Sequence, residues 1–339
     1  MQTKLVVSSS PFLRDASVST RRLMGDVVIA LIPTALAAIW FFGAPALALM
    51  LVSVVFAVLS ELVYEKITHQ KTTIDDLSAV VTGLLLAFNL PANAPWWMAA
   101  IGSIIAIVLV KQMFGGIGQN FINPALAART ILMLSWAGLI AATALPAGGQ
   151  LFGLTTVPVD AVASATPLVS SSYSLWQLFI GDVPGMLGET CKLTLILGGV
   201  YLIVRKVIDW RIPVFFIATA FILFWIQTGV IYSVESGTDN ALYQILSGGL
   251  LLGAFFMATD YVTSPVSKWG KVVMGIGCAV ILFVIRAYNN SYPEGCSFAI
   301  LFMNVLTPLI DKWTMPRTFG AVKPVKAKKS EAKQGGAKA

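Results

Sequence analysis

The hydroxyl group of Thr166 is the side chain of this sequence that is best placed to accept a covalent modification. It lies in the stretch 160–168 (DAVASATPL), where Ala163, Ser164 and Ala165 are small neighbours that leave it open. An enzyme that attaches a group to a hydroxyl needs an accessible acceptor in a flexible segment, and loops with small residues provide one. Alanine, serine and threonine are also common in ordinary loops, so the stretch alone does not decide between the two interpretations.

Asp75, Asp76 and Asp260 are acidic side chains that border short apolar segments. The first two precede the segment that begins at Leu77, and the third follows the segment that ends at Thr259. Ionisable groups near membrane helices often belong to ion or proton pathways. These three residues are therefore candidates for ion coupling, with ordinary interfacial charges in contact with water as the alternative.

The cysteine and histidine residues argue against a metal centre. Cys191, Cys278 and Cys296 show no C-x-x-C spacing, and His69 is the only histidine in the sequence. Iron–sulfur clusters, haem groups with paired histidine ligands and histidine-based zinc sites all require more ligands than these. The sequence therefore predicts no intrinsic metal site.

The composition is that of an integral membrane protein. Of 339 residues, 57% are hydrophobic and only 12% are charged, against about a quarter charged in a soluble domain. The net charge of +7 does not indicate nucleic-acid binding, because the basic residues lie in short loops and in the C-terminal tail. In such a chain, positive charge reports the orientation in the membrane.

Ten apolar segments follow one another along the chain and predict membrane-spanning helices. Several are shorter than the ~20 residues of a straight crossing, so we expect some helices to be discontinuous or extended by polar turns inside the bundle. The segments are 24–42, 44–64, 77–90, 96–110, 125–142, 190–204, 212–231, 241–259, 272–285 and 297–310.

Lysine and arginine collect in alternate connections between these segments, which indicates that both termini are cytoplasmic. The longest connection on the other side, 143–189, contains no lysine or arginine and is predicted to be periplasmic. The localisation expected is therefore a bacterial inner membrane, with Thr166 on the periplasmic side. The connections assigned to the cytoplasm contain Lys66, Lys71, Lys111, Arg129, Arg205, Lys206, Arg211, Lys268 and Lys271.

An internal repeat organises the predicted all-α fold. The sequence TGLLLAF at 82–88 resembles GLLLGAF at 249–255, five segments later, which makes the halves an inverted 5+5 repeat with discontinuous helices. Chance recurrence of Gly-Leu-Leu-Leu in apolar sequence is the alternative. The predicted parts are a cytoplasmic N-terminus (1–22), a first five-helix repeat (23–142), the periplasmic loop (143–189), a second repeat (190–312) and a basic, disordered cytoplasmic tail (313–339).

The stretch 160–168 resembles the D-x-x-S/T-G/A-A-T type of sequence at which a transferase attaches FMN to a threonine through a phosphoester. Asp160 matches the acidic position of that pattern, and Thr166 matches the acceptor. Ser164 and Ala165 precede the acceptor where Gly-Ala is commoner, a small departure from the pattern.

From about residue 10 to 320, the chain resembles the D-type member of the Rnf complex and, more distantly, the B-type member of the sodium-translocating NADH:quinone reductase. The resemblance rests on the flavin-attachment stretch and on GGIGQN at 115–120, FFMATD at 255–260, and YPEG at 292–295 with Met303 and Asn304. The length without a long N-terminal extension favours the Rnf member.

This resemblance implies an electron-transfer subunit of an ion-translocating oxidoreductase complex. It implies FMN on Thr166 and a second, noncovalent flavin (riboflavin) in the bundle, with coupling to Na⁺ or H⁺ movement. The implied partners are the other Rnf proteins, of A, B, C, E and G types. The flavin would carry the redox chemistry, while the protein positions the ring and excludes water.

Two other functions remain open from the sequence. Inverted 5+5 repeats with broken helices also form channels and transporters, including the urea-channel architecture, and such a protein would line a continuous path with polar groups and carry no chromophore. A passive scaffold subunit, with Thr166 unmodified, is the other alternative.

Overall fold

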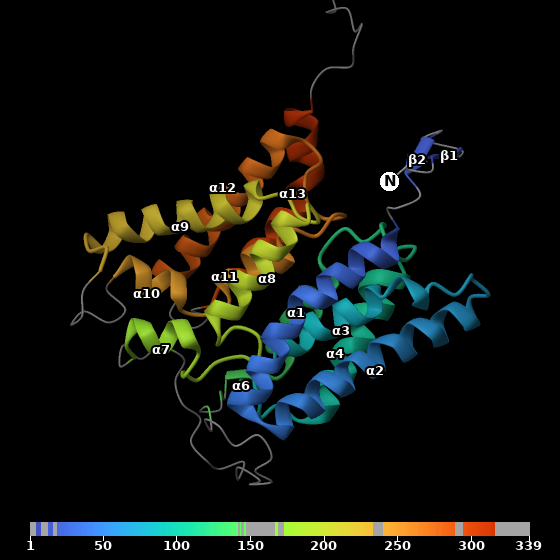
Figure 1. Cartoon of the computed structure of the whole chain (residues 1–339), viewed down its shortest axis with the longest axis horizontal. Helices are drawn as coiled ribbons and strands as arrows, with labels where there is room; N and C mark the ends of the chain where they lie inside the picture. Colours follow the sequence, from blue (N-terminus) through green and yellow to red (C-terminus); the bar gives the residue numbers. More distant parts are fainter. Residues whose placement is uncertain are drawn as a thin grey trace, which may run out of the picture.

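The structure is a computed structural model that describes residues 5–7, 13–15, 19–141, 143, 146, 167–168, 173–232, 240–288 and 294–315. Within these ranges the chain is almost entirely helical (Figure 1). The two short strands β1 (Leu5–Val7) and β2 (Leu13–Asp15) pair antiparallel ahead of the first helix. The all-α class predicted from the sequence is confirmed.

A helical segment is found at each of the ten predicted apolar segments, with small differences at the ends. The helices of the first half are α1 (Thr20–Phe42), α2 (Ala44–Ile67), η1 (Ile74–Asp76), α3 (Ser78–Phe88), α4 (Trp96–Ile104), η2 (Ile105–Gln112), α5 (Pro124–Ser135) and α6 (Ala137–Ala141). Those that follow are α7 (Leu175–Ile180), α8 (Lys192–Val204), α9 (Arg211–Thr228), α10 (Ala241–Leu246), α11 (Leu250–Leu252), η4 (Gly253–Met257), α12 (Lys268–Tyr288) and α13 (Cys296–Thr314).

Four helices within the described ranges are long and apolar enough to cross a membrane, namely α1, α2, α9 and α12. Four further apolar stretches are shorter: α3, α4 with η2, α5 and α8. The short helices bring polar turns into the bundle, as expected from the lengths of the apolar segments. The chain is thus built as a multi-pass membrane protein.

Local sequence explains where several helices start. Ser19 caps α1 by accepting a hydrogen bond from the backbone N–H of Arg22. Asn123 caps α5 through the N–H of Leu126, and Pro124 occupies the first turn, where its missing N–H costs nothing. Helix α10 ends at Leu246 with Ser247 as its C-cap, and Gly248 takes a positive φ of 65° before α11 begins. The eighth predicted segment is therefore broken.

The end of α3 is covered by the connection that precedes α8. The backbone N–H of Gly188 donates to the Phe88 carbonyl (2.9 Å), and that of Leu187 donates to the Leu90 carbonyl (3.0 Å). A β-bridge joins Pro91 to Met186. The connection that precedes α8 thereby satisfies carbonyl groups that a short helix leaves open.

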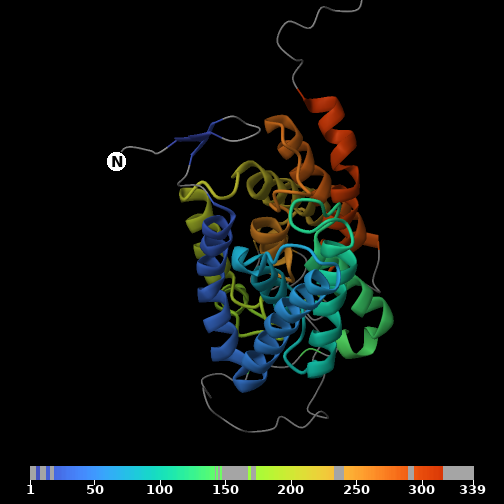
Figure 2. The same cartoon turned by 90° about the vertical axis from the view of Figure 1, so that its right-hand side faces the viewer.

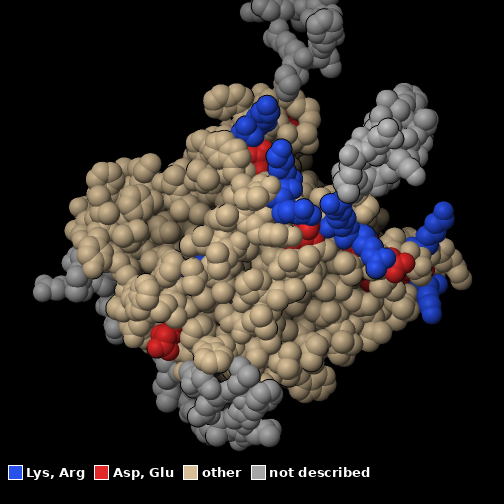
Figure 3. All heavy atoms as spheres, viewed as in Figure 1, with Lys and Arg blue, Asp and Glu red and all other residues tan. Residues whose placement is uncertain are grey.

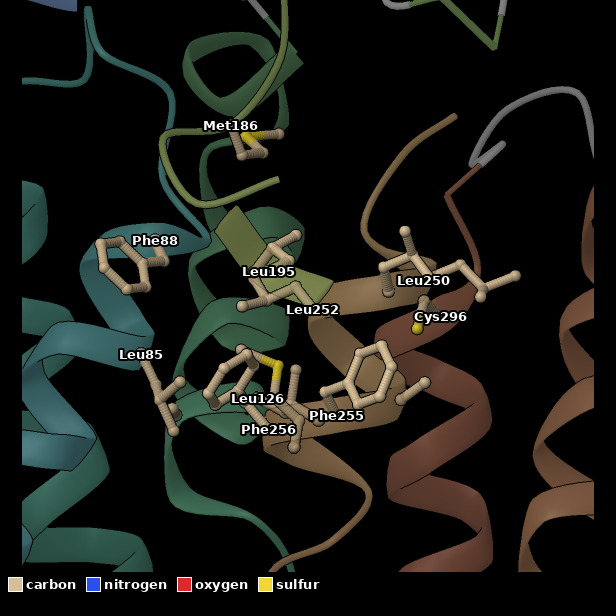
Figure 4. Packing of buried hydrophobic residues seen from close by; sticks show 14 of the residues in the cluster. Leu85, Phe88, Leu126, Met186, Leu195, Leu250, Leu252, Phe255, Phe256 and Cys296 are labelled. Carbon is tan, nitrogen blue, oxygen red and sulfur yellow. The ribbon is translucent and has the colours of Figure 1, made fainter. Parts of the chain in front are cut away.

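Apolar side chains from both halves form the centre of the bundle. Figure 4 shows Leu85 of α3, Leu126 of α5 and Phe256 of η4 converging on the same region, and all three are buried. Close packing depends on small residues, because a Cβ on Gly83 would lie 2.9 Å from the Cα of Val54 in α2. On the outside of α2, large apolar side chains are exposed, as expected of a surface that faces lipid.

Charged side chains gather in a band at one end of the bundle (Figure 3). The start of α1 and the end of α13 lie at this same end (Figure 1 and Figure 2). Ion pairs here join Arg205 to Asp26 (3.2 Å) and Lys271 to Asp209 (3.1 Å). We call this end of the molecule the charged end.

Candidate functional site

A cavity of about 370 Å³ lies between the two halves, towards the charged end. Its walls come from α1, α3, the 117–125 turn, the end of α8 and the segment from η4 to residue 262. The apolar part of the lining includes Leu85, Phe255 and Phe256. The polar part comprises Thr20, Ser78, Thr82, Lys111, Asn120, Asn123, Thr259, Asp260 and Tyr261.

Both π-helical stretches contribute to this cavity. η2 supplies Lys111, and η4 supplies Phe255 and Phe256. π-helical turns are rare and are frequently found at functional sites. The two halves therefore each place an irregular helix at the same cavity.

Asn123 links the halves beside the cavity. In addition to capping α5, it donates from its Nδ2 atom to the carbonyl of Met257 (3.2 Å), at the end of η4. Asn120 reaches Asp260 less closely, with 3.5 Å between Nδ2 and Oδ2. The Gly- and Asn-rich turn singled out in the sequence thus meets the second half of the chain here.

Of the three residues predicted to couple ion movement, Asp260 is the one that lines the cavity. Its carboxylate also accepts a hydrogen bond from the Thr263 hydroxyl (3.2 Å). Burial raises the pKa of Asp260, although the hydrogen bonds from Thr263, from backbone N–H groups and from Asn120 oppose that rise.

Asp76 and Asp75 occupy different environments. Asp76 accepts from the backbone N–H (2.7 Å) and the hydroxyl (2.5 Å) of Ser78 at the start of α3. The same hydroxyl accepts from Lys111 Nζ (2.5 Å), so Asp76 lies one hydrogen bond away from a residue that lines the cavity. Asp75 is exposed and does not line the cavity.

The sequence predicted that Lys111 and Arg129 are charges in a cytoplasmic loop. In the structure both residues are buried within helices. The Nζ atom of Lys111 pairs with Glu61 of α2 (2.6 Å), and both side chains are at most 4% exposed. Arg129 in α5 pairs with Glu294, just before α13. The prediction was wrong because a single charge next to apolar residues is typical of the end of a membrane span. A buried partner of opposite charge can instead stabilise such a charge inside the bundle.

The predicted modification site lies at the edge of the described residues. Asp160, Ser164, Ala165 and Thr166 lie outside them, whereas Pro167 and Leu168, which follow directly, are described. The hydroxyl of Tyr243 in α10 donates to the Pro167 carbonyl (3.1 Å). A Cβ on Gly248 would lie 2.9 Å from Leu168 Cδ1, so Leu168 packs on the break between α10 and α11.

A cluster of five buried or half-buried charges lies beside this contact. It consists of Arg129, Glu189, Lys192, Arg286 and Glu294, from four different parts of the chain. The same hypothetical Cβ on Gly248 would lie 3.1 Å from the guanidinium of Arg286 and 3.8 Å from Glu294 Oε1. The cluster and the segment after Thr166 therefore meet at one glycine.

Sequence reasoning missed this cluster. By sequence, Lys192 and Arg286 are charges near the outer side. Glu294 belongs to the YPEG stretch that supports the resemblance, but the sequence assigned no role to it or to Glu189. The available signal was the isolated charge at the edge of each apolar segment, because charges near membrane helices tend to face protein. Which charge pairs with which partner follows only from the packing of the helices.

The fold and the cavity define a polytopic membrane protein built around a cavity with apolar and polar lining that two halves of the chain share. A family model described as the NQR2, RnfD, RnfE family matches residues 6–320. The chain belongs to this family.

Several named relatives are similar over almost their whole length, and each is the D-type member of a redox complex. The chain is 45% identical to that of the Na⁺-translocating ferredoxin:NAD⁺ oxidoreductase complex of Acetobacterium woodii, covering 97% of this chain and 99% of the relative. It is 40% identical to that of the proton-translocating ferredoxin:NAD⁺ oxidoreductase complex of Clostridium ljungdahlii, covering 93% and 96%. It is 33% identical to that of the ion-translocating oxidoreductase complex of Escherichia coli, covering 93% and 98%.

Proposed function

We propose that this chain is a flavin-carrying membrane subunit of an ion-translocating oxidoreductase complex. It would pass electrons between a flavin protein on the periplasmic side and redox proteins on the cytoplasmic side, coupled to movement of Na⁺ or H⁺. The observation that carries the proposal is the family match across 6–320, together with near full-length similarity to the D-type members of such complexes. The partners would be the Rnf proteins of A, B, C, E and G types.

Covalent FMN on Thr166 is the first part of the proposal. The stretch 160–168 supplies the acceptor, and the contact of Tyr243 with Pro167 supports it, because a fixed point directly after the acceptor limits where an attached ring can go. The fixed point lies at the end of the bundle opposite the charged end, where α7 and α10 are found (Figure 1). With the charged end cytoplasmic, that end is periplasmic.

A noncovalent riboflavin in the central cavity is the second part. The cavity volume of about 370 Å³ is within the roughly 300–1,000 Å³ of small-molecule pockets. Phe255 and Phe256 offer apolar surface for a flat ring, while Asn120 and Lys111 offer polar groups for its edges. The bound flavin would supply one-electron and two-electron chemistry, and these residues would orient it and keep water away.

The inverted 5+5 arrangement belongs to the same proposal. Each half contributes a short helix, α3 or α11 with η4, and a π-helical stretch at the cavity. Binding sites between such repeats are typical of inverted-repeat membrane proteins. Asp260 would then be close enough to respond to the charge of a flavin in the cavity. Asp76 would respond through its hydrogen bond with Ser78.

The structure gives little support to the channel alternative. Among the described residues, the buried apolar side chains of Leu85, Leu126 and Phe256 converge where α3, α5 and η4 meet, and Leu85 and Phe256 form part of the cavity wall (Figure 4). A solute path would need polar groups along this line.

In-gel fluorescence tests the covalent flavin. The chain is produced with its flavin transferase, separated on a denaturing gel and viewed under ultraviolet light. We expect a fluorescent band for the wild type and for Ser164→Ala, and none for Thr166→Ala. A dark wild-type band, or a fluorescent Thr166→Ala band, would contradict attachment at Thr166.

Filling the cavity tests the second flavin. Val27 of α1 lines the cavity, so Val27→Trp should displace a noncovalent flavin. Flavin released by mild acid from the purified protein should fall at least tenfold, while in-gel fluorescence is unchanged. Val55→Trp on the exposed face of α2 is the matched control and should retain the released flavin. Equal release from both variants would place the second flavin elsewhere.

A further inference from the structure

The turn that joins η2 to α5 has one side on the cavity and the other side exposed. Ile117 and Gly118 line the cavity. Phe114 and Phe121 are about half exposed, at 50% and 49%. A single turn of chain therefore separates the cavity from its surroundings at this point, and we call residues 115–120 (GGIGQN) the flap.

Glycine gives the flap its backbone shape. Gly115, Gly116 and Gly118 have φ angles of 112°, 86° and 89°, a region that other residues rarely adopt. A Cβ on Gly118 would have no atom within 4 Å, and a Cβ on Gly116 would meet Gln112 Oε1 at 3.5 Å. The flap is thus loosely packed and has room to move.

The hydrogen bonds of the flap attach it more firmly to its own half of the chain than to the other half. The N–H of Gly116 donates to the carbonyl of Lys111 in η2 (3.1 Å). Among the described residues, the hydrogen bond that joins the flap to the second half runs from Asn120 Nδ2 to Asp260 Oδ2 and is long, at 3.5 Å. A segment with few contacts to the opposite wall opens at low cost in free energy.

The two ends of the flap are fixed. The rings of Phe114 and Phe121 pack edge to face at its base, with 4.8 Å between their centroids. Directly after this base, Asn123 caps α5 and donates to the carbonyl of Met257 (3.2 Å). A short segment between fixed ends is the usual construction of a loop that opens and closes over a site.

We propose that the flap opens and closes the cavity, with Ile117 as the apolar side chain that seals it. Ile117 lines the cavity and is also 37% exposed, so it lies at the boundary between the cavity and the outside. Opening breaks the contact of Asn120 with Asp260, leaves Asn123 in place and admits a small molecule between the two halves. Only the identity of the admitted molecule depends on the proposed riboflavin.

A cysteine placed in the cavity reports on the flap. Thr82→Cys puts a thiol of similar size on the cavity wall, where Thr82 is 9% exposed. The native cysteines are all buried, and the protein without Thr82→Cys gives their background. The probe is a water-soluble maleimide added to the purified protein, and the measured quantity is the rate of labelling at the engineered thiol.

Two glycine substitutions in the Thr82→Cys background separate the flap from general backbone strain. Gly118 and Gly229 both have a positive φ (89° and 69°), and an added Cβ meets no atom within 4 Å at either position. Because an L side chain disfavours this backbone region, we expect Gly118→Ala to raise the labelling rate about tenfold. Gly229→Ala, at the end of α9, should leave the rate unchanged. Equal rates for the two variants would overturn the proposal.

A second flap variant guards against failure of Gly118→Ala to fold. Phe121→Leu removes the ring contact at the base but keeps an apolar side chain, and it should also raise the labelling rate. Melting temperatures of the flap variants should match that of Gly229→Ala. A rate that follows a lower melting temperature in every variant would overturn the flap, because global unfolding would then explain the labelling.

Release of riboflavin on dilution of the purified protein connects the flap to the proposed function. Its half-time should shorten in the same variants that raise the labelling rate. Faster labelling with an unchanged half-time would contradict the flap as the exit for the flavin. If the wild type releases no riboflavin, that result counts against the second flavin, while the labelling rates still decide whether the flap opens.

Discussion

The ion pair between Lys111 and Glu61 shows how a single charge is held inside this bundle. Glu61 Oε1 accepts from Lys111 Nζ (2.6 Å) and from Gln112 Nε2 (2.7 Å), and Lys111 also donates to Ser78. A buried pair gives modest net stability, but removal of one member leaves the other charge without compensation.

Replacing Lys111 should therefore destabilise the protein strongly. We expect Lys111→Met to lower the free energy of unfolding by about 3–5 kcal/mol, because Glu61 is left buried and unpaired. Thermal unfolding of the detergent-solubilised protein measures the loss. The double variant Glu61→Gln with Lys111→Met should recover much of it, and a double variant as unstable as the single one would contradict this explanation.

For individual residues, the sequence predicted which side chains lie at the site better than it predicted which partners they contact. It singled out Asp260 and Asp76, which the structure places in or next to the cavity. It assigned Arg129 and Lys111 to a cytoplasmic connection, because a charge beside apolar residues is typical of the end of a span. Their partners, Glu294 and Glu61, are far away in sequence, and no local pattern reveals such a contact.

Asp209 connects two elements at the charged end. It lies between α8 and α9 and pairs with Arg211 (2.9 Å) and with Lys271 of α12 (3.1 Å). Partial burial raises its pKa, but the backbone N–H of Arg211, the Lys271 ammonium and the Arg211 guanidinium together lower it below the usual value.

The stabilisation from Asp209 should depend on pH. A carboxylate whose pKa is lowered by folding stabilises the protein above its unfolded pKa of about 3.9, and this contribution is lost as the pH falls through the lower, folded value. Asp209→Asn should thus be less stable than the wild type at pH 7, by about 1 kcal/mol or less for a part-exposed pair. The gap in melting temperature should close in acid. A gap that widens below about pH 4 would refute this.

Gly188 sets the distance between α3 and the connection that covers its end. A Cβ at this position would overlap the Cβ and ring of Phe88. We expect Gly188→Ala to cost about 1–3 kcal/mol, as overpacking does. Gly138→Ala is the matched control, because it lies in α6 with no atom within 4 Å of the added Cβ, and it should be neutral or slightly stabilising. Similar melting temperatures for the two variants would exclude this role.

The elements themselves were well predicted, because long apolar segments have few alternatives in a membrane protein. The break in the eighth segment was not located, although Ser247, Gly248 and Gly249 are a reasonable signal for it. The π-helical turns were not predicted either. Such a turn depends on how the helix packs against its neighbours, which composition does not express.

Across the described part of the molecule, charged side chains gather on the surface of the charged end, and the proposed topology places this end in the cytoplasm. Green fluorescent protein fused after residue 339 should then be fluorescent, because it folds only in the cytoplasm. Alkaline phosphatase fused after residue 173 should be active, because it needs the periplasm. An inactive phosphatase fusion together with a non-fluorescent green fluorescent protein fusion would indicate the opposite orientation. If either reporter were active at both positions, the chain would not have a single topology.

The contact of Gly188 with the end of α3 also sets an order of events during synthesis. Phe88 is made about 100 residues before Gly188, which at roughly 5–20 residues per second is a delay of about 5–20 s. During that interval the carbonyl of Phe88 lacks the hydrogen bond from Gly188. The first half should therefore remain a substrate for insertion chaperones until the second arrives, and splitting the gene between the halves should abolish accumulation of either piece alone.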